Sequence, residues 1–295
     1  MCVMPRVSVV VPTYNSVEFI DATMGSILAQ SFSDFELVVS DHSSTDGTWE
    51  ALQPYTADPR VRVTRLASGG GAPANWNAVT DLGTGEFIKL VCGDDVLYPE
   101  NLAMQVAALT AHPSAVLAAS TRDIIDAAGR AVLRGRGLKG LRGEVTGVEA
   151  IRHTVLAGTN IFGEPASVMF RRSALVDASG WDSRFPYLID LATYCAVLLR
   201  GNLVAVPGPL AAFRVSRSQW SVQLMRSQAD QTIGFQRELA TTQPGLLNRR
   251  HLWVGSARAH ANALGRRAVY RWLGRRMRPS TSADNGQRDI RRGGC

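Results

Sequence analysis

The sequence predicts an α/β protein in which a mostly parallel sheet carries helices on both faces. Short apolar runs alternate with segments of helical length through residues 1–120, which is the pattern of βαβ units joined by right-handed crossovers. Every such run ends in polar or glycine-rich residues. Because the carboxyl ends of parallel strands meet at one edge of a sheet, these loops should form a single crevice. The predicted strands are residues 7–11, 35–40, 61–66, 87–91 and 115–120.

The first three strands each lead into a turn and then a helix. The first, VSVVV, is β-branched almost throughout, as a buried parallel strand should be. It breaks at a Pro-Thr-Tyr-Asn turn, and a helix with one apolar face follows. The second strand breaks at Asp41, and a helix begins near residue 48. The third is followed by a glycine-rich loop, 68–73, and a helix over 74–81.

The fourth strand ends at Cys92-Gly93-Asp94-Asp95. Residues 99–111 form the next predicted helix, with a proline in its first turn, where the missing N–H costs nothing. Two adjacent carboxylates at the end of a strand either shape the turn or hold a hard cation. Because Mg²⁺ and Mn²⁺ take one or two carboxylates together with phosphate oxygens, this turn predicts a metal site that carries a diphosphate.

The second half of the chain contains two further candidate carboxylates. Residues 123–130 form a predicted hairpin that turns at 128–129, and 148–156 form a short helix. Glu164 lies in a loop bounded by glycine and proline, and is either a turn residue or a ligand contact. Asp190 directly precedes an apolar helix, 191–199, so it is a candidate helix N-cap.

The C-terminal region differs from the rest of the chain in charge. Residues 249–295 contain 12 Arg and 2 Asp, a net charge of +10, which leaves −3 for residues 1–248 out of the total of +7. The basic character therefore belongs to residues 249–295, and the pI of 9.7 does not predict a nucleic-acid-binding protein. Residues 222–241 and 246–277 are predicted helices, and 279–295 a disordered basic tail.

The second of these helices is basic and amphipathic, with nine Arg and no acid over 249–278. Its positive charge and apolar stripe suit an anionic membrane surface, but the stripe could equally pack on the body of the protein. The stripe residues are Leu252, Ala259, Ala263, Tyr270, Leu273 and Met277.

Composition indicates a cytoplasmic protein. Apolar residues make up 45% of the chain, enough for a sizeable core. The four cysteines lack disulfide-framework or metal-ligand spacing, which fits a reducing compartment. No signal peptide or membrane-spanning run is visible. We therefore expect a cytoplasmic protein, with peripheral attachment to the inner face of the plasma membrane as an added hypothesis.

Three motifs in this order, VSVVVPTYN, FSDFELVVSDHSSTDGT and GEFIKLVCGDDVLYPENL, resemble the nucleotide-sugar domain of the inverting GT-A glycosyltransferases, the large second family of such enzymes. The resemblance covers roughly residues 5–220. It implies a GT-A domain over 1–220, with a donor-binding half (1–120) and an acceptor half (121–220). A helical extension (221–278) and the tail (279–295) would follow.

The resemblance also assigns roles on the donor side, for a nucleotide-diphospho-sugar. Asp94 aligns with the family's metal ligand for Mg²⁺ or Mn²⁺, and Asp95 is the second choice. Relatives usually have acids where this chain has His42 and Cys92. The change at His42 leaves the base of the nucleotide open, and the change at Cys92 favours packing or a ribose contact over metal binding by this thiol. A neutral His42 still accepts one hydrogen bond. The implied donor-binding residues are Pro12, Thr13, Tyr14, Asp41, His42, Asn75, Cys92, Gly93 and Asp94.

On the acceptor side, the segment around Gly180-Trp181-Asp182 and Asp190 resembles the family motif that carries the catalytic base. Asp190 would be that base, and its apolar neighbours would raise its pKa by excluding water. The other candidates for acceptor or diphosphate contacts are Glu164, Arg214, Arg217 and Trp220.

The predicted activity is metal-dependent, inverting transfer of a hexosyl or deoxyhexosyl group to a hydroxyl of a glycan or lipid-linked acceptor. The alternative is a catalytically inactive sugar-nucleotide-binding or scaffold protein of the same fold. It is motivated by the departures at His42, Cys92 and Ile189.

Overall fold

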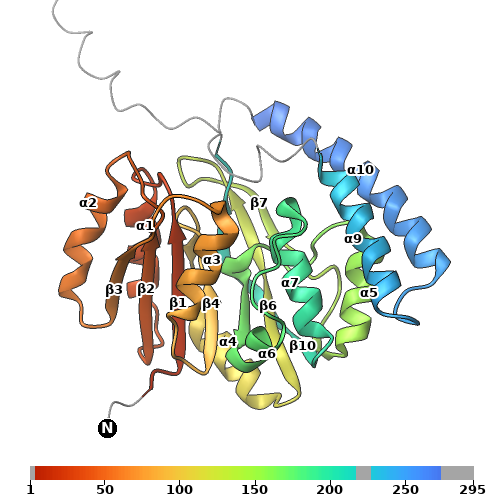
Figure 1. Ribbon diagram of the computed structural model, residues 1–295, viewed down its shortest axis with the longest axis horizontal. Coiled ribbons are helices and arrows are strands. Elements are labelled where there is room, and N and C mark those ends of the chain that lie inside the picture. Colours follow the sequence, from red (N-terminus) through yellow and green to blue (C-terminus); the bar gives the residue numbers. More distant parts are fainter. Residues whose placement is uncertain (1–3, 217–226, 274–295) are drawn as a thin grey trace, which may run out of the picture.

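The computed structural model describes residues 4–216 and 227–273 (Figure 1). In this part of the chain, ten strands form one sheet in the order β3-β2-β1-β4-β9-β6-β10-β5, with β7 paired to β6 and β8 to β10. The strands are β1 (Val7–Thr13), β2 (Phe35–Asp41), β3 (Val61–Arg65), β4 (Phe87–Leu90), β5 (Val96–Leu97), β6 (Ala115–Ile125), β7 (Ala131–Arg136), β8 (Gly143–Val145), β9 (Val168–Arg171) and β10 (Asn202–Arg214).

The donor half is built from the four parallel strands β3, β2, β1 and β4. Successive side chains of a strand point to opposite faces, and the valines of β1 show the result. Val9 and Val11 are buried in the core beneath one set of helices, while Val10 is buried in the core on the other face. The nearly continuous apolar run of β1 is therefore explained by burial on both faces.

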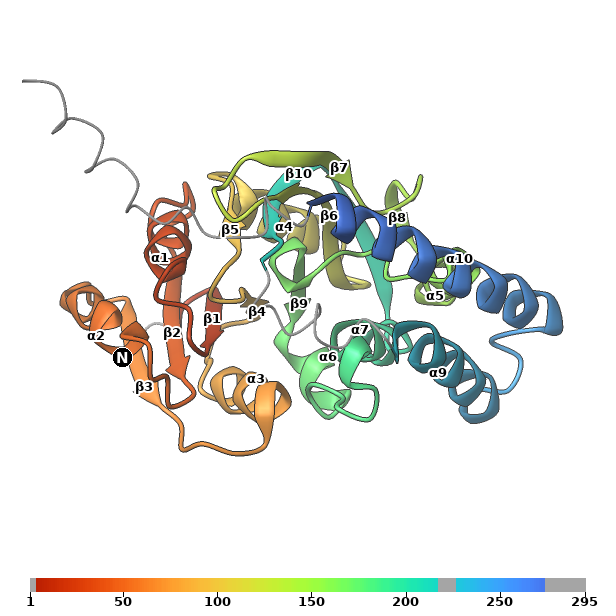
Figure 2. The same cartoon turned by 90° about the horizontal axis from the view of Figure 1, so that it is seen from above.

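Helices cover both faces of the sheet, which confirms the predicted α/β class (Figures 1 and 2). The core on one face includes side chains from α1 (Ile20–Leu28), α2 (Thr48–Leu52) and α4 (Asn101–Ala111). The core on the other face includes side chains from the remaining helices of the body and from α9. These helices are α3 (Gly71–Asp81), α5 (Gly147–Ala157), α6 (Arg172–Asp177) and α7 (Ile189–Leu198).

The predicted, mostly parallel sheet is interrupted at its centre by one strand from the second half of the chain. Strand β9 lies between β4 and β6 and is antiparallel to both. A short 3₁₀ turn, Pro165–Ser167, leads directly into β9, and two others cover Gln53–Ala57 and Pro186–Leu188. Because β9 comes from a position some 80 residues after β4 in the chain, no local pattern could have placed it between β4 and β6.

The second half adds a predicted hairpin and a strand that returns to the donor half. Strands β6 and β7 pair antiparallel across the turn at Gly129, whose φ is +78°. Strand β10 runs parallel to β6 and also pairs antiparallel with β5, directly after the acidic turn. This last pairing joins the end of β10 to the turn that follows β4.

The helical extension consists of α9 (Gln228–Thr242) and α10 (Arg249–Leu273), which pack on each other, with α10 also on α5 (Figure 2). Ala259 and Ala263 of the predicted apolar stripe are buried, so this part of the stripe faces the body. A Cβ on Gly158 would come within 2.5 Å of the Ala259 nitrogen, which shows how closely α5 and α10 approach. Within the described ranges, no helix has the length and apolar content to cross a bilayer.

Candidate active site

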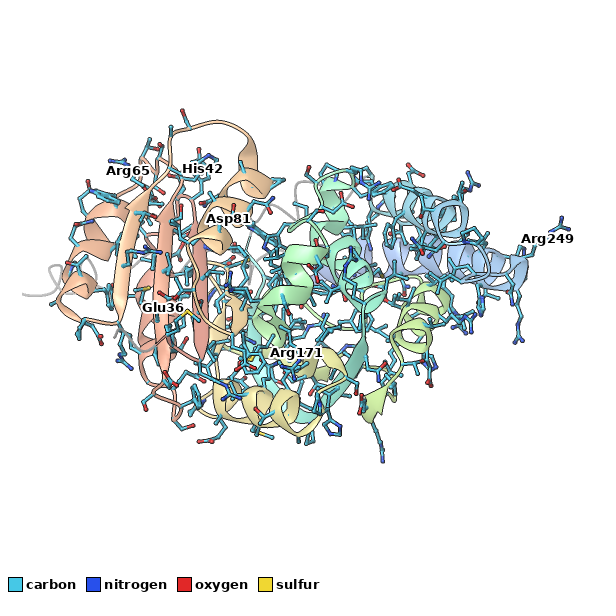
Figure 3. The ribbon with its side chains drawn as sticks, turned by 60° about the horizontal axis from the view of Figure 1, so that its bottom comes forward. Glu36, His42, Arg65, Asp81, Arg171 and Arg249 are labelled. Carbon is cyan, nitrogen blue, oxygen red and sulfur yellow. The ribbon has the colours of Figure 1, made fainter. Side chains whose placement is uncertain are left out.

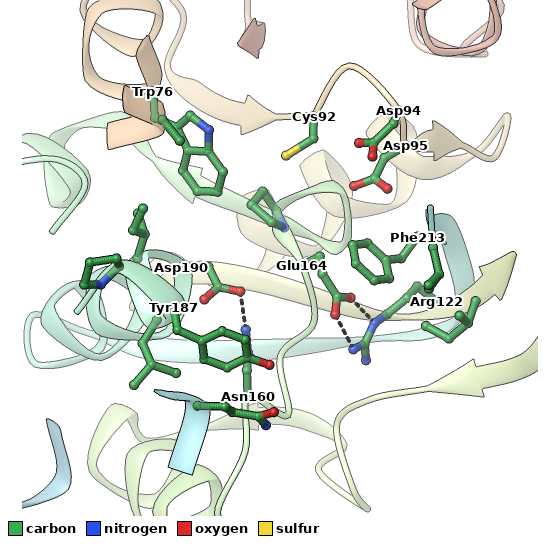
Figure 4. Close-up of a pocket in the computed structure, with 18 of the residues that line it drawn as sticks. Trp76, Cys92, Asp94, Asp95, Arg122, Asn160, Glu164, Tyr187, Asp190 and Phe213 are labelled. Carbon is green, nitrogen blue, oxygen red and sulfur yellow. Dashed lines mark hydrogen bonds and ion pairs between the residues drawn. The ribbon is translucent and has the colours of Figure 1, made fainter. Parts of the chain in front are cut away.

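The carboxyl ends of the donor strands and the loops of the acceptor half enclose one cavity of about 1170 Å³. The predicted residues Asp94 and Asp190 both line it, from opposite halves of the domain (Figure 4). The other predicted residues in its lining are Pro12, Thr13, Tyr14, His42, Asn75, Cys92, Gly93, Asp95 and Glu164.

At the donor end, Asn75 of α3 joins the ends of β1 and β2. Its amide nitrogen donates to the carbonyls of Thr13 (3.3 Å) and Ser40 (3.2 Å). The Asn75 side-chain oxygen and the Thr13 hydroxyl are buried and have no hydrogen-bond partner among the described residues. Buried polar groups normally have partners, so these two atoms are available to a ligand.

His42 contacts the glycine-rich loop through its ring. Its Nε2 lies 2.8 Å from the carbonyl oxygen of Gly69. A carbonyl only accepts, so we assign the proton to Nε2, which leaves Nδ1 of the neutral ring as an acceptor. The Tyr14 ring packs edge-on to His42 at 6.2 Å, and Figure 3 shows His42 near Arg65 at this end of the sheet.

Asp41 is fully buried and is not part of the cavity lining in the described structure. One of its carboxylate oxygens accepts from the Ser44 amide (3.2 Å) and lies 3.4 Å from Arg65. The other oxygen has no partner among the described residues. The predicted contact of Asp41 with the nucleoside stays a prediction.

The acidic turn after β4 is tightly packed against the end of β1. A Cβ on Gly93 would lie 2.6 Å from the Thr13 hydroxyl, so only glycine fits without a shift. Asp95 is fully buried, and one of its oxygens accepts from the Arg214 amide at 3.1 Å. Burial, and next the neighbouring Asp94, raise the pKa of Asp95 well above its usual value. Burial and the same two carboxylates also raise the pKa of the Cys92 thiol.

Arg214, the last residue of β10, holds the acidic turn through hydrogen bonds to Asp94 and Asp95. Its guanidinium donates to the carbonyls of Asp94 (2.8 Å), Asp126 (3.2 Å) and Ala127 (3.1 Å) and lies over the Phe19 ring. The geometry makes Arg214 a positioning residue for the acidic turn, and its predicted contact with diphosphate stays untested. The predicted residues Arg217 and Trp220, like the tail 279–295, lie outside the described residues.

Asp190 lies in the first turn of α7 and is held by two hydrogen bonds. One oxygen accepts from the Leu191 amide and the other from the Asn160 side chain, each at 2.7 Å (Figure 4). Leu188 is the N-cap of α7, so the interpretation of Asp190 as the helix N-cap is wrong. Loss of water around the carboxyl, and next the negative charge of Glu164, raise the pKa of Asp190 to about 6.

Glu164 has the opposite shift. Burial acts to raise its pKa, but the charge and hydrogen bonds of Arg122, with smaller contributions from a backbone hydrogen bond and the charge of Arg266, together hold the pKa below its usual value. Arg122 binds both oxygens of Glu164, at 2.5 and 3.0 Å. At the acceptor end of the cavity, the pKa of one carboxyl group, Glu164, is therefore lowered and that of its neighbour, Asp190, is raised. Neighbouring carboxyl groups whose pKa values move apart are the pattern of acid–base sites.

Sequence reasoning missed four residues of the acceptor end: Arg122, Asn160, Tyr187 and Arg266. Arg266 of α10 lines the cavity, bonds the Tyr187 hydroxyl and lies 3.4 Å from the Thr159 hydroxyl. Their partners lie between 30 and 107 residues away. For Arg266, the excess of arginine in the C-terminal helix was the only signal, and it gave no indication of contact with the cavity.

Metal binding by protein ligands alone does not fit this site. The described residues contain no group of three or more His, Cys, Asp or Glu side chains able to hold an ion. A carboxylate at the cavity surface, Asp94, does fit an ion that takes its other ligands from phosphate oxygens and water. Cys92 is a poor ligand for such a hard cation.

Comparison with known proteins agrees with this geometry. Residues 8–177 match the family model described as glycosyl transferase family 2. An uncharacterized Mycobacterium tuberculosis protein, MT1568, is 30% identical over 230 residues, which is 75% of this chain and 70% of that protein. The Staphylococcus aureus poly(ribitol-phosphate) β-N-acetylglucosaminyltransferase TarS is 35% identical over 39% of this chain. The match covers only 20% of TarS.

Solved structures share the fold. TarS residues 1–349 in complex with UDP-GlcNAc superpose with a TM-score of 0.65 at 22% identity, over 84% of this chain and 69% of that one. The Pyrobaculum calidifontis mannosyltransferase PcManGT in complex with GDP-Man and Mn²⁺ gives a TM-score of 0.56 at 18% identity, over 92% and 81% of the two chains. These matches confirm the predicted GT-A architecture.

Proposed function

The chain belongs to glycosyl transferase family 2, and from this premise we propose that it moves a sugar from a nucleotide-diphospho-sugar to a hydroxyl of a glycan or lipid-linked acceptor, with inversion. The enzyme class, glycosyltransferase, follows from the family. The single observation that supports the rest is that Asp190, with a raised pKa, lines the same cavity as Asp94.

The donor would lie across the ends of β1, β2 and β4. Solved neighbours of the same fold hold UDP-GlcNAc and GDP-Man, which supports a nucleotide sugar here. The buried Thr13 hydroxyl would donate to or accept from the nucleoside, and the Asn75 oxygen would accept a hydrogen bond from it. The neutral His42 ring offers an acceptor for a base N–H.

Asp94 would hold Mg²⁺ or Mn²⁺ together with the diphosphate, with Asp95 as a second candidate ligand. When bound, such an ion stabilises the charge that develops on the leaving diphosphate. Arg214 and Gly93 would keep Asp94 in place, because they hold the acidic turn against β10 and β1.

Asp190 would act as the general base. It takes the proton of the acceptor hydroxyl while that oxygen attacks the anomeric carbon, and the bond from this carbon to the diphosphate oxygen breaks. The configuration inverts in this single displacement, and no covalent enzyme intermediate forms. A base with a pKa of about 6 is ionised at neutral pH and still close enough to that pH to accept a proton effectively.

Membrane attachment would use the outward face of α10, because Ala259 and Ala263 of the predicted stripe are buried against the body. The side chains of Tyr270, Leu273 and Met277 of that stripe lie outside the described part of the chain. Trp253 and Leu264 are 76% and 65% exposed, and eleven residues, or about three turns, place them on the same side of the helix. Exposed Arg250 and Arg267 lie on this side as well. This combination of aromatic, aliphatic and basic side chains suits an anionic lipid surface.

The decisive experiment compares three variants in a donor-consumption assay. A thermal-shift screen of UDP-, GDP- and dTDP-sugars with Mn²⁺ first identifies the donor. Asp190→Asn should then reduce transfer by about 10²–10⁴-fold while the donor still shifts the melting temperature. Asp94→Ala should lose the metal-dependent part of that shift as well.

The matched control is Asp81→Asn, a change of the same kind at an exposed carboxylate at the end of α3 (Figure 3). It should behave as the wild type. Near-full activity of Asp190→Asn would remove Asp190 as the base. A wild-type protein that binds a donor but neither transfers nor hydrolyses it would instead favour the inactive sugar-nucleotide-binding protein.

A further inference from the structure

The acceptor end of the cavity carries positive charge that the proposed reaction does not use. Arg136 at the end of β7, Lys139 in the loop between β7 and β8, and Arg266 of α10 all line the cavity. Within the described ranges, neither Arg136 nor Lys139 forms an ion pair with an acid. By contrast, Arg130 and Arg134, on or beside the same strand, are paired with Asp126 and Asp123.

Hydrogen bonds hold this cationic loop beside the proposed base. The Leu138 amide donates to the Ile161 carbonyl at 2.6 Å, and the Arg122 guanidinium donates to the Arg136 carbonyl at 2.9 Å. Ile161 directly follows Asn160, whose side chain binds Asp190. The loop is therefore attached to the segment that positions the base, and not to the acidic turn on the donor side.

The cations are close enough to affect one another. Burial first, and then the positive charges of Arg258 and Arg136, lower the pKa of Lys139. Arg258 is held toward this region by a bond of 3.0 Å to the Leu156 carbonyl. Like charges that are gathered without an anion destabilise one another, so a bound anion would relieve the repulsion.

We propose that the acceptor carries an anionic group, a phosphate or a carboxylate, which Arg136 and Lys139 bind while the acceptor hydroxyl faces Asp190. Arg266 lies on the α10 side of the same region, where it bonds Tyr187. Arginine supplies a planar pair of donors for such an oxyanion, and lysine a compact charge. This inference rests on the proposed function, and it narrows the acceptor to anionic hydroxyl compounds.

The test uses pairs of alcohols that differ only in the anion: glycerol against sn-glycerol 3-phosphate, and glucose against glucuronate. Calorimetric titration measures binding of each to the nucleotide-free, full-length protein. The wild type should bind the phosphate, the uronate or both about tenfold more tightly than the neutral partner. Tighter binding of the phosphate or of the uronate shows whether the anionic group of the acceptor is a phosphate or a carboxylate. Lys139→Ala and Arg136→Ala should each reduce that preference about tenfold, and Lys139→Arg should restore most of it.

The matched control is Arg134→Ala, which removes one charge from β7 at a side chain that is 80% exposed and outside the cavity lining. It should leave the preference unchanged. Equal binding of both members of each pair would overturn the proposal, and so would an equal loss in Arg134→Ala.

Donor hydrolysis by water separates this proposal from the proposed function. In this proposal the side chains of Arg136 and Lys139 contact the acceptor and not the donor. The KM for the donor in hydrolysis should therefore be the same in Lys139→Ala and Arg136→Ala as in the wild type. A raised donor KM would assign the cations to the donor diphosphate and overturn the inference. If no protein consumes any donor, the proposed function fails, and the calorimetric preference still decides whether the anion site exists.

Discussion

Replacing Asn160 with alanine tests how the protonation of Asp190 is controlled. The Asn160 amide donates to Asp190 at 2.7 Å and so stabilises the ionised carboxylate. It also lowers the pKa of Asp190 against the larger opposing effects of burial and Glu164. Removing this bond therefore raises the pKa further, and it leaves the Asp190 side chain itself intact.

The size of the effect follows from the strength of one bond. A hydrogen bond to a charged group contributes roughly 1.5–3 kcal/mol, or about 1–2 pKa units at 1.36 kcal/mol per unit. A pKa of about 6 leaves roughly nine-tenths of Asp190 ionised at pH 7. A pKa of 7 to 8 would leave about half to about one-tenth ionised. Asn160→Ala should thus lose about two- to tenfold in kcat/KM at pH 7.

The assay is the pH dependence of kcat/KM between pH 5 and 9, which reports the pKa of the free enzyme. Because only the ionised base is active, activity is lost as the pH falls, and the variant should lose it at a higher pH than the wild type. At pH 9 the two proteins should be nearly equal. The control is Asn202→Ala, which removes a half-buried amide that donates to Glu144, far along the chain from the proposed base.

Two outcomes would refute this reasoning. A pH profile that coincides with the wild type would show that Asn160 does not influence the base. Asn160 also accepts from the amides of Phe162 and Gly163, so the variant could distort that loop. A loss of activity that persists at pH 9 would indicate this structural effect instead of a shifted pKa.

Two further predictions concern stability and membrane attachment. Lys89 is fully buried, and its amine donates a hydrogen bond to the side-chain oxygen of Gln105. Burial lowers the pKa of this amine well below its usual value of 10.5. Below about pH 10 the unfolded chain therefore binds a proton at Lys89 that the folded protein lacks. The free energy of unfolding of the wild type should for this reason increase with pH, relative to that of Lys89→Met, by up to about 1.4 kcal/mol per pH unit. Urea unfolding at pH 7, 8 and 9 measures the difference, and parallel curves would contradict it. For attachment, Trp253→Ser/Leu264→Ser should bind phosphatidylglycerol vesicles at least about tenfold more weakly than the wild type. Equal sedimentation with the vesicles would exclude this face of α10 as the contact.

The sequence by itself determined the local elements and the family. Strand β1 could be predicted because burial on both faces demands a run of β-branched residues, and that demand is met within seven consecutive positions. The acidic turn after β4 was visible for the same reason, since a strand that ends abruptly in carboxylates is a local pattern. Asp190 was found through a motif, and its raised pKa was expected from the apolar neighbours beside it in the chain.

Only the tertiary structure decided which groups meet in the cavity. The insertion of β9 between β4 and β6, the Arg122–Glu164 ion pair and the hold of Asn160 on Asp190 depend on contacts between distant segments. The C-terminal helix shows this most clearly. Its arginine content predicted a charged surface, but α10 closely approaches Gly158, the C-cap of α5, and Arg266 of α10 lines the cavity. The spacing of apolar residues along a segment indicates which of its faces is exposed to solvent. Which group a charged side chain contacts depends on how distant segments pack against each other.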